Sequence, residues 1–179
     1  MPIWHPPTES IAKVSRFEHL RHKPPRELKQ PRELVIACAP MRSNVNLSRI
    51  VRVAGCCGVR RIICCGTAKI LDKIARDGAD EVEVEVHRTL LPVLKKLKVD
   101  NYELVGLEQT THAEDIHSAQ FARRMVLVVG NERTGLTDEI LAVLDRVVEI
   151  PVWGLPYSYN AATSACMALY EYCRQWPEG

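Results

Sequence analysis

Three short groups of residues along the chain have the types and the spacing to do chemistry. Asn46 is a good N-cap for a predicted helix, and Arg52 lies six residues further on, under two turns away. Residues 130–135 (GNERTG) follow an apolar run; their glycines permit a tight turn near a ligand, and Glu132 offers a charged acceptor. Residues 158–160 (SYN) open a helix that begins with small residues. Each group alone is compatible with an ordinary capped helix or loop, so their combination matters.

Other common chemistries lack their motifs. The sequence has no GxGxxG after its first predicted strand, no GxxxxGK[ST] and no GxSxG, which argues against dinucleotide binding, a P-loop and hydrolase chemistry. The cysteines form no Cys-x-x-Cys and have no closely spaced histidines, so we expect no metal site. Reduced, mostly buried thiols in a cytoplasmic protein are the better interpretation. The seven cysteines are Cys38, Cys56, Cys57, Cys64, Cys65, Cys166 and Cys173.

Size and composition indicate one compact domain preceded by a basic segment. The chain has 179 residues, of which 46% are hydrophobic, and no apolar run reaches membrane-spanning length. Residues 1–32 are rich in proline and carry a net charge of +4, whereas residues 33–179 carry −2. A basic arm on a mildly acidic body favours a nucleic-acid contact, although a solvated leader is equally compatible with composition. We predict an arm at 1–32, with one short helix near 11–22, and a domain at 33–179.

Alternating strands and helices follow the arm and predict the fold class. Such alternation is typical of an α/β protein with a mostly parallel sheet and helices on both faces. Ligands bind such sheets beyond the carboxyl ends of the strands, so the loops after Leu107, Val129 and Ile150 qualify. The predicted strands are 34–39, 61–65, 81–87, 102–107, 125–129 and 146–150, and the predicted helices are 46–56, 67–76, 89–98, 137–144 and 158–175.

The order and spacing of the three groups resemble the SpoU/TrmH branch of the SPOUT RNA methyltransferases. That family has Asn-x-Gly followed by Arg, then Gly-x-Glu-x-x-Gly, then Ile-Pro before Ser-x-Asn, and the resemblance covers residues 34–175. Residues 106–110 (GLEQT) and 170–175 (YEYCRQ) resemble the subgroup that methylates the ribose of a tRNA guanosine. The resemblance therefore implies an S-adenosylmethionine-dependent RNA ribose 2′-O-methyltransferase, acting on tRNA or alternatively on rRNA.

The same resemblance implies a fold feature, a cofactor site and partners. SPOUT domains end in a deep trefoil knot, an exception to the rule against knotted chains, and the knot loops bind S-adenosylmethionine in a bent conformation. These enzymes are homodimers in which the partner completes the RNA site. Mapped residue by residue, the expected cofactor-binding residues are Leu107, Gly130, Ile150, Ser158 and Tyr159.

Arg52 is the central catalytic residue by family analogy. Either it acts as the base for the ribose 2′-hydroxyl, or it clamps the RNA phosphate and stabilises developing negative charge. A guanidinium is effectively always protonated, which makes the clamp the easier physical role. The other expected catalytic residues hold Arg52, the cofactor loop and the ribose; they are Asn46, Glu132, Ser158 and Asn160.

Some positions depart from the family pattern. Ser48 stands where the family usually has glycine, Arg49 where a small residue is common, and Tyr159 where leucine is usual. Ser48 is expected to add a side chain near the approaching ribose. These departures leave open a third reading, a knotted RNA-binding protein that no longer transfers methyl groups, although the retained motif residues oppose it.

Overall fold

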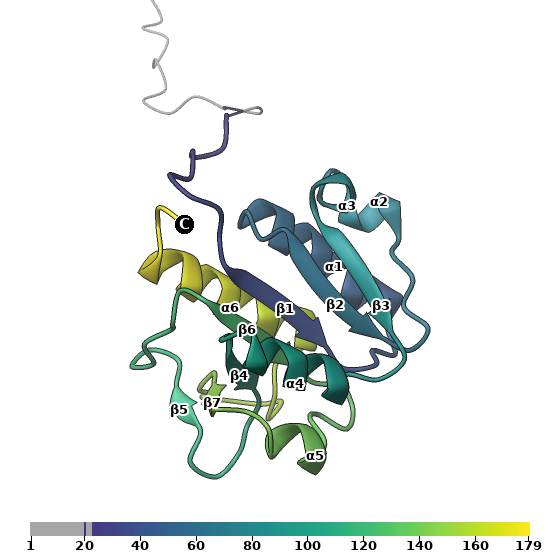
Figure 1. Cartoon of the computed structure of the whole chain (residues 1–179), viewed down its shortest axis with the longest axis vertical. Coiled ribbons are helices and arrows are strands. Elements are labelled where there is room, and N and C mark those ends of the chain that lie inside the picture. Colours follow the sequence, from purple (N-terminus) through teal and green to yellow (C-terminus); the bar gives the residue numbers. More distant parts are fainter. Residues whose placement is uncertain (1–19, 21–22) are drawn as a thin grey trace, which may run out of the picture.

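The computed structural model describes residue 20 and residues 23–179, and within them one seven-stranded sheet forms the centre of the molecule (Figure 1). All paired strands run parallel, in the order β3-β2-β1-β6-β4-β7-β5. The strands are β1 (Leu34–Cys38), β2 (Arg61–Cys65), β3 (Glu83–His87), β4 (Glu103–Leu107), β5 (Glu114–Asp115), β6 (Met125–Val129) and β7 (Arg146–Glu149). The predicted parallel sheet is confirmed.

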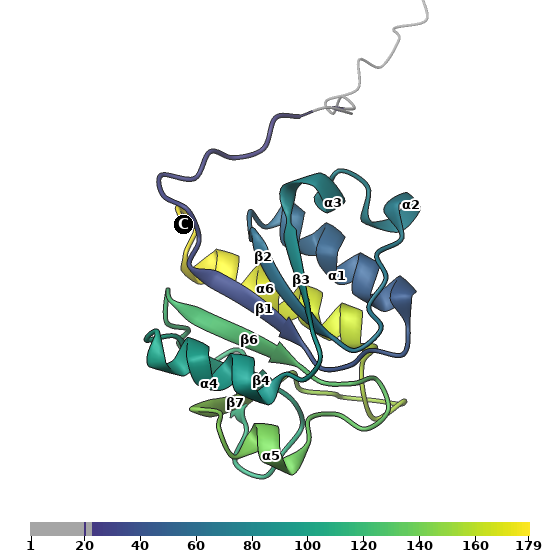
Figure 2. The same cartoon turned by 45° about the vertical axis from the view of Figure 1, so that its right-hand side comes forward.

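Helices cover both faces of this sheet, as predicted. Figures 1 and 2 show α1 and α6 together on one face, while α4 and α5 lie on the other. Side chains alternate along a strand, so β1 sends Leu34, Ile36 and Cys38 toward α1 and α6, and Val35 and Ala37 toward α4. The helices are α1 (Asn44–Cys56), α2 (Asp72–Ala75), α3 (Gly78–Glu81), α4 (Leu91–Val99), α5 (Asp138–Leu141) and α6 (Ala161–Gln175).

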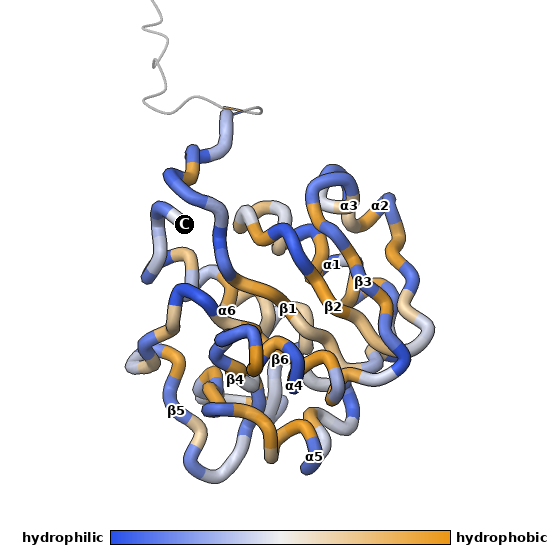
Figure 3. The backbone as a smooth tube through the Cα atoms, in the orientation of Figure 1, coloured by the Kyte–Doolittle hydropathy of each residue, from blue (hydrophilic) through white to orange (hydrophobic). Residues whose placement is uncertain are grey.

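Burial explains the near-continuous apolar runs of the central strands. Every residue of β1 and β6 is buried, as parallel strands covered on both faces must be. Figure 3 shows these strands as hydrophobic stretches, whereas most connecting loops are hydrophilic. Strand β3 is less buried because it lies at the edge of the sheet: Glu83 and Val86 are exposed.

The structure differs from the predicted elements mainly between β2 and β3. The helix predicted at 67–76 is replaced by the short α2 and α3, because Arg76 has a φ of 51° and ends α2. Gly78 then passes so close to α1 that an added Cβ would lie 3.0 Å from the Cα of Arg52. The two-residue strand β5 was not predicted, since two residues carry no periodicity.

The last residues of the predicted arm contact the domain. Lys29 N–H donates to the Glu178 carbonyl (2.9 Å), and the Gln30 side chain donates to the Gly179 carbonyl (3.1 Å). Arg32 donates to the carbonyls of Cys57 and Trp176, both at 2.6 Å. Any truncation that tests the arm should therefore keep these residues. The short helix predicted near 11–22 lies almost wholly outside the described residues.

No helix in the described part of the chain is both long enough and apolar enough to cross a membrane.

Candidate functional site

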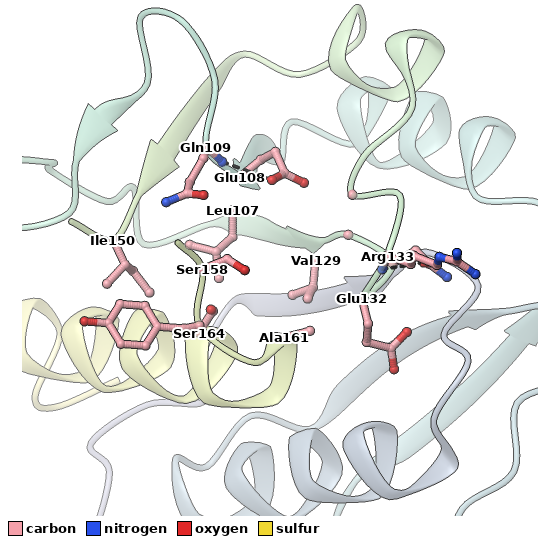
Figure 4. Close-up of a pocket in the computed structure, with 14 residues that line it drawn as sticks. Leu107, Glu108, Gln109, Val129, Glu132, Arg133, Ile150, Ser158, Ala161 and Ser164 are labelled. Atoms are coloured by element: carbon pink, nitrogen blue, oxygen red, sulfur yellow. Dashed lines mark hydrogen bonds between the residues drawn. The ribbon is translucent and has the colours of Figure 1, made fainter. Parts of the chain in front are cut away.

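The candidate site lies where β6, β4 and β7 end side by side in the sheet. The loops that follow these strands, together with the start of α6, enclose a pocket of about 230 Å³ (Figure 4). This is the position where open parallel sheets bind ligands. All five predicted cofactor-binding residues line it. The full lining is Leu107, Glu108, Gln109, Val129, Gly130, Asn131, Glu132, Arg133, Gly135, Ile150, Ser158, Tyr159, Ala161 and Ser164.

The loop 130–135 is a closed turn that its two glycines make possible. The N–H and carbonyl groups of Asn131 and Gly135 bond to each other in both directions, at 3.1 and 3.0 Å. Gly135 has a φ of +64°, which favours glycine. A Cβ added to Gly130 would lie 2.8 Å from the Gly135 carbonyl carbon. The prediction that these glycines permit a tight turn is confirmed.

Glu108 braces this turn from the neighbouring strand end. Its carboxylate accepts hydrogen bonds from the N–H groups of Gln109 and Leu136, both at 3.0 Å. The same carboxylate lies so close to Gly135 that an added Cβ there would clash with it. The sequence predicted no role for Glu108 beyond its place in the segment 106–110, because the contact with Leu136 joins residues 28 positions apart.

A chain of hydrogen bonds joins the three predicted motifs. One Glu132 oxygen accepts from the Asn46 side chain (3.1 Å) and from the Ser43 N–H (3.0 Å), and the other accepts from the Arg42 N–H (2.9 Å). The Asn46 side-chain oxygen accepts from the Asn160 side chain at 3.2 Å. Glu132, Asn46 and Asn160 therefore connect the turn after β6, the start of α1 and the start of α6.

The electrostatics of Glu132 follow from these bonds. Burial alone would raise its pKa, but hydrogen bonds from the Arg42 N–H, the Asn46 side chain and the Ser43 N–H outweigh that effect. The pKa is therefore held below its ordinary value of 4.5, and the carboxylate is charged at neutral pH. A charged acceptor at this point fixes the donors around it rather than taking a proton from a substrate.

Helix capping differs from the prediction and frees Asn46 for this network. α1 begins at Asn44, two residues earlier than predicted, and Ser43 caps it by accepting a hydrogen bond from the Asn46 N–H at 3.2 Å. The expectation that Asn46 caps α1 is wrong. Its side chain is buried and points to Glu132 instead. Asn160 caps α6, accepting from the Ala162 and Thr163 N–H groups at 3.0 and 3.3 Å.

Ser48 does not project toward the pocket. Its side chain is fully buried, donates to the Asn44 carbonyl at 2.6 Å and accepts from the Leu71 N–H at 2.8 Å. The hydroxyl thus holds the segment before α2 against α1. The expectation that Ser48 adds a side chain near the ribose is not met by this geometry.

Arg52 neither lines the pocket nor takes part in the hydrogen-bonded network of Glu132, Asn46 and Asn160. It is exposed on α1, and its side chain forms no hydrogen bond or ion pair within the described residues. Ser158 and Tyr159 are also exposed, at the rim of the pocket. Of the five residues predicted as catalytic, three form the network and Ser158 lines the pocket, while Arg52 faces solvent in the single chain.

The loop between β7 and α6 contributes Ile150, Ser158 and Tyr159 to the pocket lining, and most of its other residues are exposed. Trp153 and Tyr157 are each 81% exposed, and Leu155 is 76% exposed. A hydrogen bond from the Gln109 side chain to the Tyr157 carbonyl (3.2 Å) ties this loop to the loop after β4. His117 stacks on Trp153 with a ring-centroid separation of 6.5 Å. Exposed aromatic residues beside a pocket are typical of surfaces that interact with another protein or a ligand.

The fold and the pocket together define an α/β domain with a pocket at the carboxyl ends of parallel strands. The sequence model of the SpoU rRNA Methylase family matches residues 33–170, and the chain therefore belongs to this family of RNA methyltransferases.

Individual relatives agree with the family. The chain is 27% identical over 150 residues to the tRNA (guanosine(18)-2′-O)-methyltransferase of Escherichia coli, covering 82% of this chain and 65% of the relative. It is 29% identical over 148 residues to the 23S rRNA (guanosine-2′-O-)-methyltransferase RlmB of Acinetobacter baylyi, covering 79% and 60%. The chain thus spans somewhat less than two thirds of the length of these relatives.

Solved structures have the same fold. The Aquifex aeolicus TrmH/SpoU tRNA modifying enzyme superposes with a TM-score of 0.79 at 26% identity, covering 84% of this chain and 79% of the other. The Streptomyces viridochromogenes SpoU methyltransferase AviRb, solved in complex with the cofactor AdoMet, has a TM-score of 0.71 at 24% identity, covering 85% and 64%. At that identity, AviRb supports the fold alone.

Proposed function

We propose that this chain is an S-adenosylmethionine-dependent RNA ribose 2′-O-methyltransferase that acts on a tRNA guanosine. One observation carries the proposal: the five cofactor residues inferred from the family motifs line a single pocket. A hydrogen-bonded network of motif residues joins that pocket to α1. The proposal includes the C-terminal trefoil knot of the SPOUT fold, built from the segment 150–175.

The residues of the pocket fit S-adenosylmethionine. Leu107 and Ile150 offer apolar surface for the adenine, and Tyr159 adds a flat ring at the rim. Hydroxyl and amide groups of Ser158, Ser164 and Gln109 supply hydrogen-bonding partners. Without side chains, Gly130 and Gly135 leave backbone exposed at the pocket wall. When bound, the cofactor supplies an activated methyl group on a positively charged sulfur.

The motif residues would act mainly by orientation. Glu132 and Asn160 hold Asn46 from two sides, which fixes the start of α1 against the pocket. Arg52, on the same helix, is free to contact RNA, and we assign it to the phosphate and to negative charge developing on the 2′-oxygen. Alignment of the attacking oxygen with the methyl group accounts for much of the acceleration in such transfers.

A second copy of the chain would complete the RNA site. Arg52 lies outside the pocket of its own chain, and the exposed Trp153, Leu155 and Tyr157 leave apolar surface uncovered beside that pocket. We propose a homodimer that buries this surface. Light scattering should give the mass of two chains, and Trp153→Asp should shift it toward one. A monomeric wild-type protein would contradict the dimer.

The arm is proposed to strengthen RNA binding through its positive charge. Deleting residues 1–26 removes most of that charge while keeping the contacts of residues 29–32 with the domain. RNA affinity and its salt dependence should both fall, and cofactor affinity should not change. Unchanged RNA affinity would assign the arm to a solvated leader. The division into an arm and a domain depends on this result.

The relatives of this chain include enzymes that methylate tRNA and enzymes that methylate rRNA. The tRNA enzyme of E. coli and residues 106–110 favour tRNA, whereas the rRNA relative keeps ribosomal RNA as the alternative. The burial of Ser48 weakens the reading as an inactive binder, because this departure from the family lies away from the pocket. The free cysteines are consistent with a cytoplasmic location.

The decisive experiment is methylation of total RNA with labelled S-adenosylmethionine, followed by mapping of the modified nucleotide. We expect a 2′-O-methylated guanosine in tRNA, and label confined to rRNA would select the alternative. Arg52→Ala should lower transfer at least about 100-fold with cofactor affinity retained. The matched control is Arg60→Ala, an exposed arginine after α1. Absence of saturable cofactor binding by calorimetry would favour the inactive RNA-binding protein.

A further inference from the structure

Two cysteines lie close together at the C-terminal ends of α1 and α6, whereas the N-terminal ends of these helices lie at the pocket. Cys57 follows α1 directly, and Cys173 lies in the last turn of α6. The Cys173 thiol donates to the Cys57 carbonyl oxygen at 3.9 Å, which places it against the backbone of the other cysteine. Both residues are half-buried, so each keeps part of its surface in contact with solvent.

Arg32 makes this pair electropositive. Its guanidinium donates to the Cys57 carbonyl and to the Trp176 carbonyl, both at 2.6 Å, and lies over the Tyr172 ring. The neighbouring Cys57 thiol, followed by the positive charge of Arg32, lowers the pKa of Cys173 to about 7 despite its partial burial. The interaction between the two thiols raises the pKa of Cys57. One thiol is thus poised as a thiolate and the other as its protonated partner.

A second thiol pair provides an internal contrast. Cys38 and Cys64 directly follow the paired residues Ala37 and Ile63 on the adjacent strands β1 and β2, but both are buried. Buried thiols of this kind are unreactive. Among the described residues, no group of three or more histidine, cysteine or acidic side chains is arranged to hold a metal. The half-buried pair is therefore better suited to redox chemistry than to metal binding.

We propose that Cys57 and Cys173 form a reversible, peroxide-sensitive disulfide that joins the ends of α1 and α6. The Cys173 thiolate attacks one oxygen of hydrogen peroxide; the O–O bond breaks, giving a sulfenic acid and, after protonation, water. The Cys57 thiol then attacks the sulfenic sulfur; the S–S bond forms and a second water leaves. The peroxide is reduced, and the two thiols together lose two hydrogen atoms. A dithiol reductant reverses the step.

This bond would bear on the candidate site through the helices it joins. α1 carries Asn46 and α6 follows Asn160, and the side chains of these two residues are bonded at 3.2 Å. A covalent link at the other end of the helix pair limits their relative movement. The proposal rests on the thiols alone and holds whatever reaction the pocket performs.

Peptide mapping of the full chain tests the proposal. The reduced protein is exposed to hydrogen peroxide, remaining thiols are blocked with N-ethylmaleimide, and tryptic peptides are weighed. We expect the Cys57–Cys173 peptide pair as the main product, reversed by dithiothreitol, with Cys38 and Cys64 still in thiol form. The melting temperature should rise by roughly 5 °C on oxidation, since the link spans a long loop. Oxidation that links other cysteines, or leaves Cys173 free, would overturn the proposal.

Variants separate the reactive thiol from its partner. Cys57→Ser should stop the disulfide and leave a sulfenic acid at Cys173, which dimedone traps. Cys173→Ser should leave Cys57 unoxidised. The matched control is Cys166→Ser, which removes an exposed cysteine of the same helix and should leave the disulfide yield unchanged. A Cys166→Ser protein that no longer forms the disulfide would count against the proposed pair.

Discussion

Two loops that border the same pocket are built in opposite ways. The turn 130–135 is fixed inside a single chain: Glu108 bonds the N–H beyond it, and Glu132 reaches from it to α1. In the loop 150–160, Trp153 and Tyr157 are each 81% exposed. The Gln109 side chain, in the loop after β4, donates one hydrogen bond to this loop. The wall formed by the turn 130–135 is therefore held by contacts within the chain, whereas the wall formed by the loop 150–160 leaves apolar surface exposed.

This difference indicates where each part of the function resides. A wall that is already ordered needs no conformational change to bind the cofactor, which lowers the entropic cost of binding. A wall with uncovered aromatic side chains gains stability when a second chain or RNA covers it. Changes in the turn 130–135 should therefore damage the isolated chain, whereas changes in loop 150–160 should spare it.

Glu132→Ala should have the largest effect of the variants that test the difference between the two walls. It removes the acceptor of three hydrogen bonds, from Arg42, Ser43 and Asn46, and so separates the ordered turn from α1. We expect methyl transfer to fall at least about 100-fold and the free energy of unfolding to fall by about 1–2 kcal/mol. Kinetic assays and urea unfolding measure the two effects.

The control for this variant is Glu139→Ala, which removes an exposed carboxylate of α5. Its unfolding free energy should stay within about 0.5 kcal/mol of wild type, and its transfer rate should not change. If Glu132→Ala behaved like this control, Glu132 would not hold the turn against α1.

A pair of glycine substitutions compares the two walls directly. Gly135 has a φ of +64° and its added Cβ would meet the Glu108 carboxylate, whereas a Cβ at Gly154 would meet nothing within 4 Å. Gly135→Ala should lower the unfolding free energy by about 1–2 kcal/mol and weaken cofactor affinity about tenfold. Gly154→Ala should change stability by less than about 0.5 kcal/mol. Calorimetry measures the cofactor affinity of both variants, and thermal melts measure their stability. Equal losses of stability in the two variants would mean that the two walls are equally constrained.

The sequence predicted the sheet and most of the pocket because both depend on local patterns. Buried strands read as apolar runs, and 61–65 and 125–129 were predicted to the residue. The pocket followed from the rule that ligands bind beyond the carboxyl ends of parallel strands, together with the family motifs. Those two sources predict Leu107, Gly130 and Ile150, all of which line the pocket.

What the sequence did not predict depends on partners far apart in the chain. The role of Glu108 comes from a bond to the backbone of Leu136, and the inward orientation of Ser48 comes from a bond to the Leu71 N–H. Thiol burial also differs from expectation, since Cys56 and Cys166 are exposed and only Cys38, Cys64 and Cys65 are buried. Pattern reasoning sees residue types and spacing, whereas these contacts arise from packing.

The smallest expected effect is the contribution of the Glu132 charge to the free energy of unfolding. It separates the charge of Glu132 from its hydrogen-bonding geometry as a support of the turn 130–135. Hydrogen bonds from Arg42, Asn46 and Ser43 hold the pKa of Glu132 below 4.5 in the folded protein, in spite of its partial burial. Because the folded-state pKa is the lower one, the charge stabilises the fold above pH 4.5 and this contribution is lost as the pH falls through the folded-state value. Glu132→Gln removes the titrating group.

The stability difference between wild type and Glu132→Gln should therefore shrink as the pH falls from about 7 to below 4.5. We expect a change of a few tenths of a kcal/mol, because solvent screens a partly exposed carboxylate. The lowered pKa values of Glu33, Glu85, Asp145 and Glu171 affect both proteins equally and cancel in this difference. Urea unfolding at several pH values measures it. A difference that stayed constant with pH would mean that Glu132 holds the turn by its shape and hydrogen-bonding geometry alone, without help from its charge.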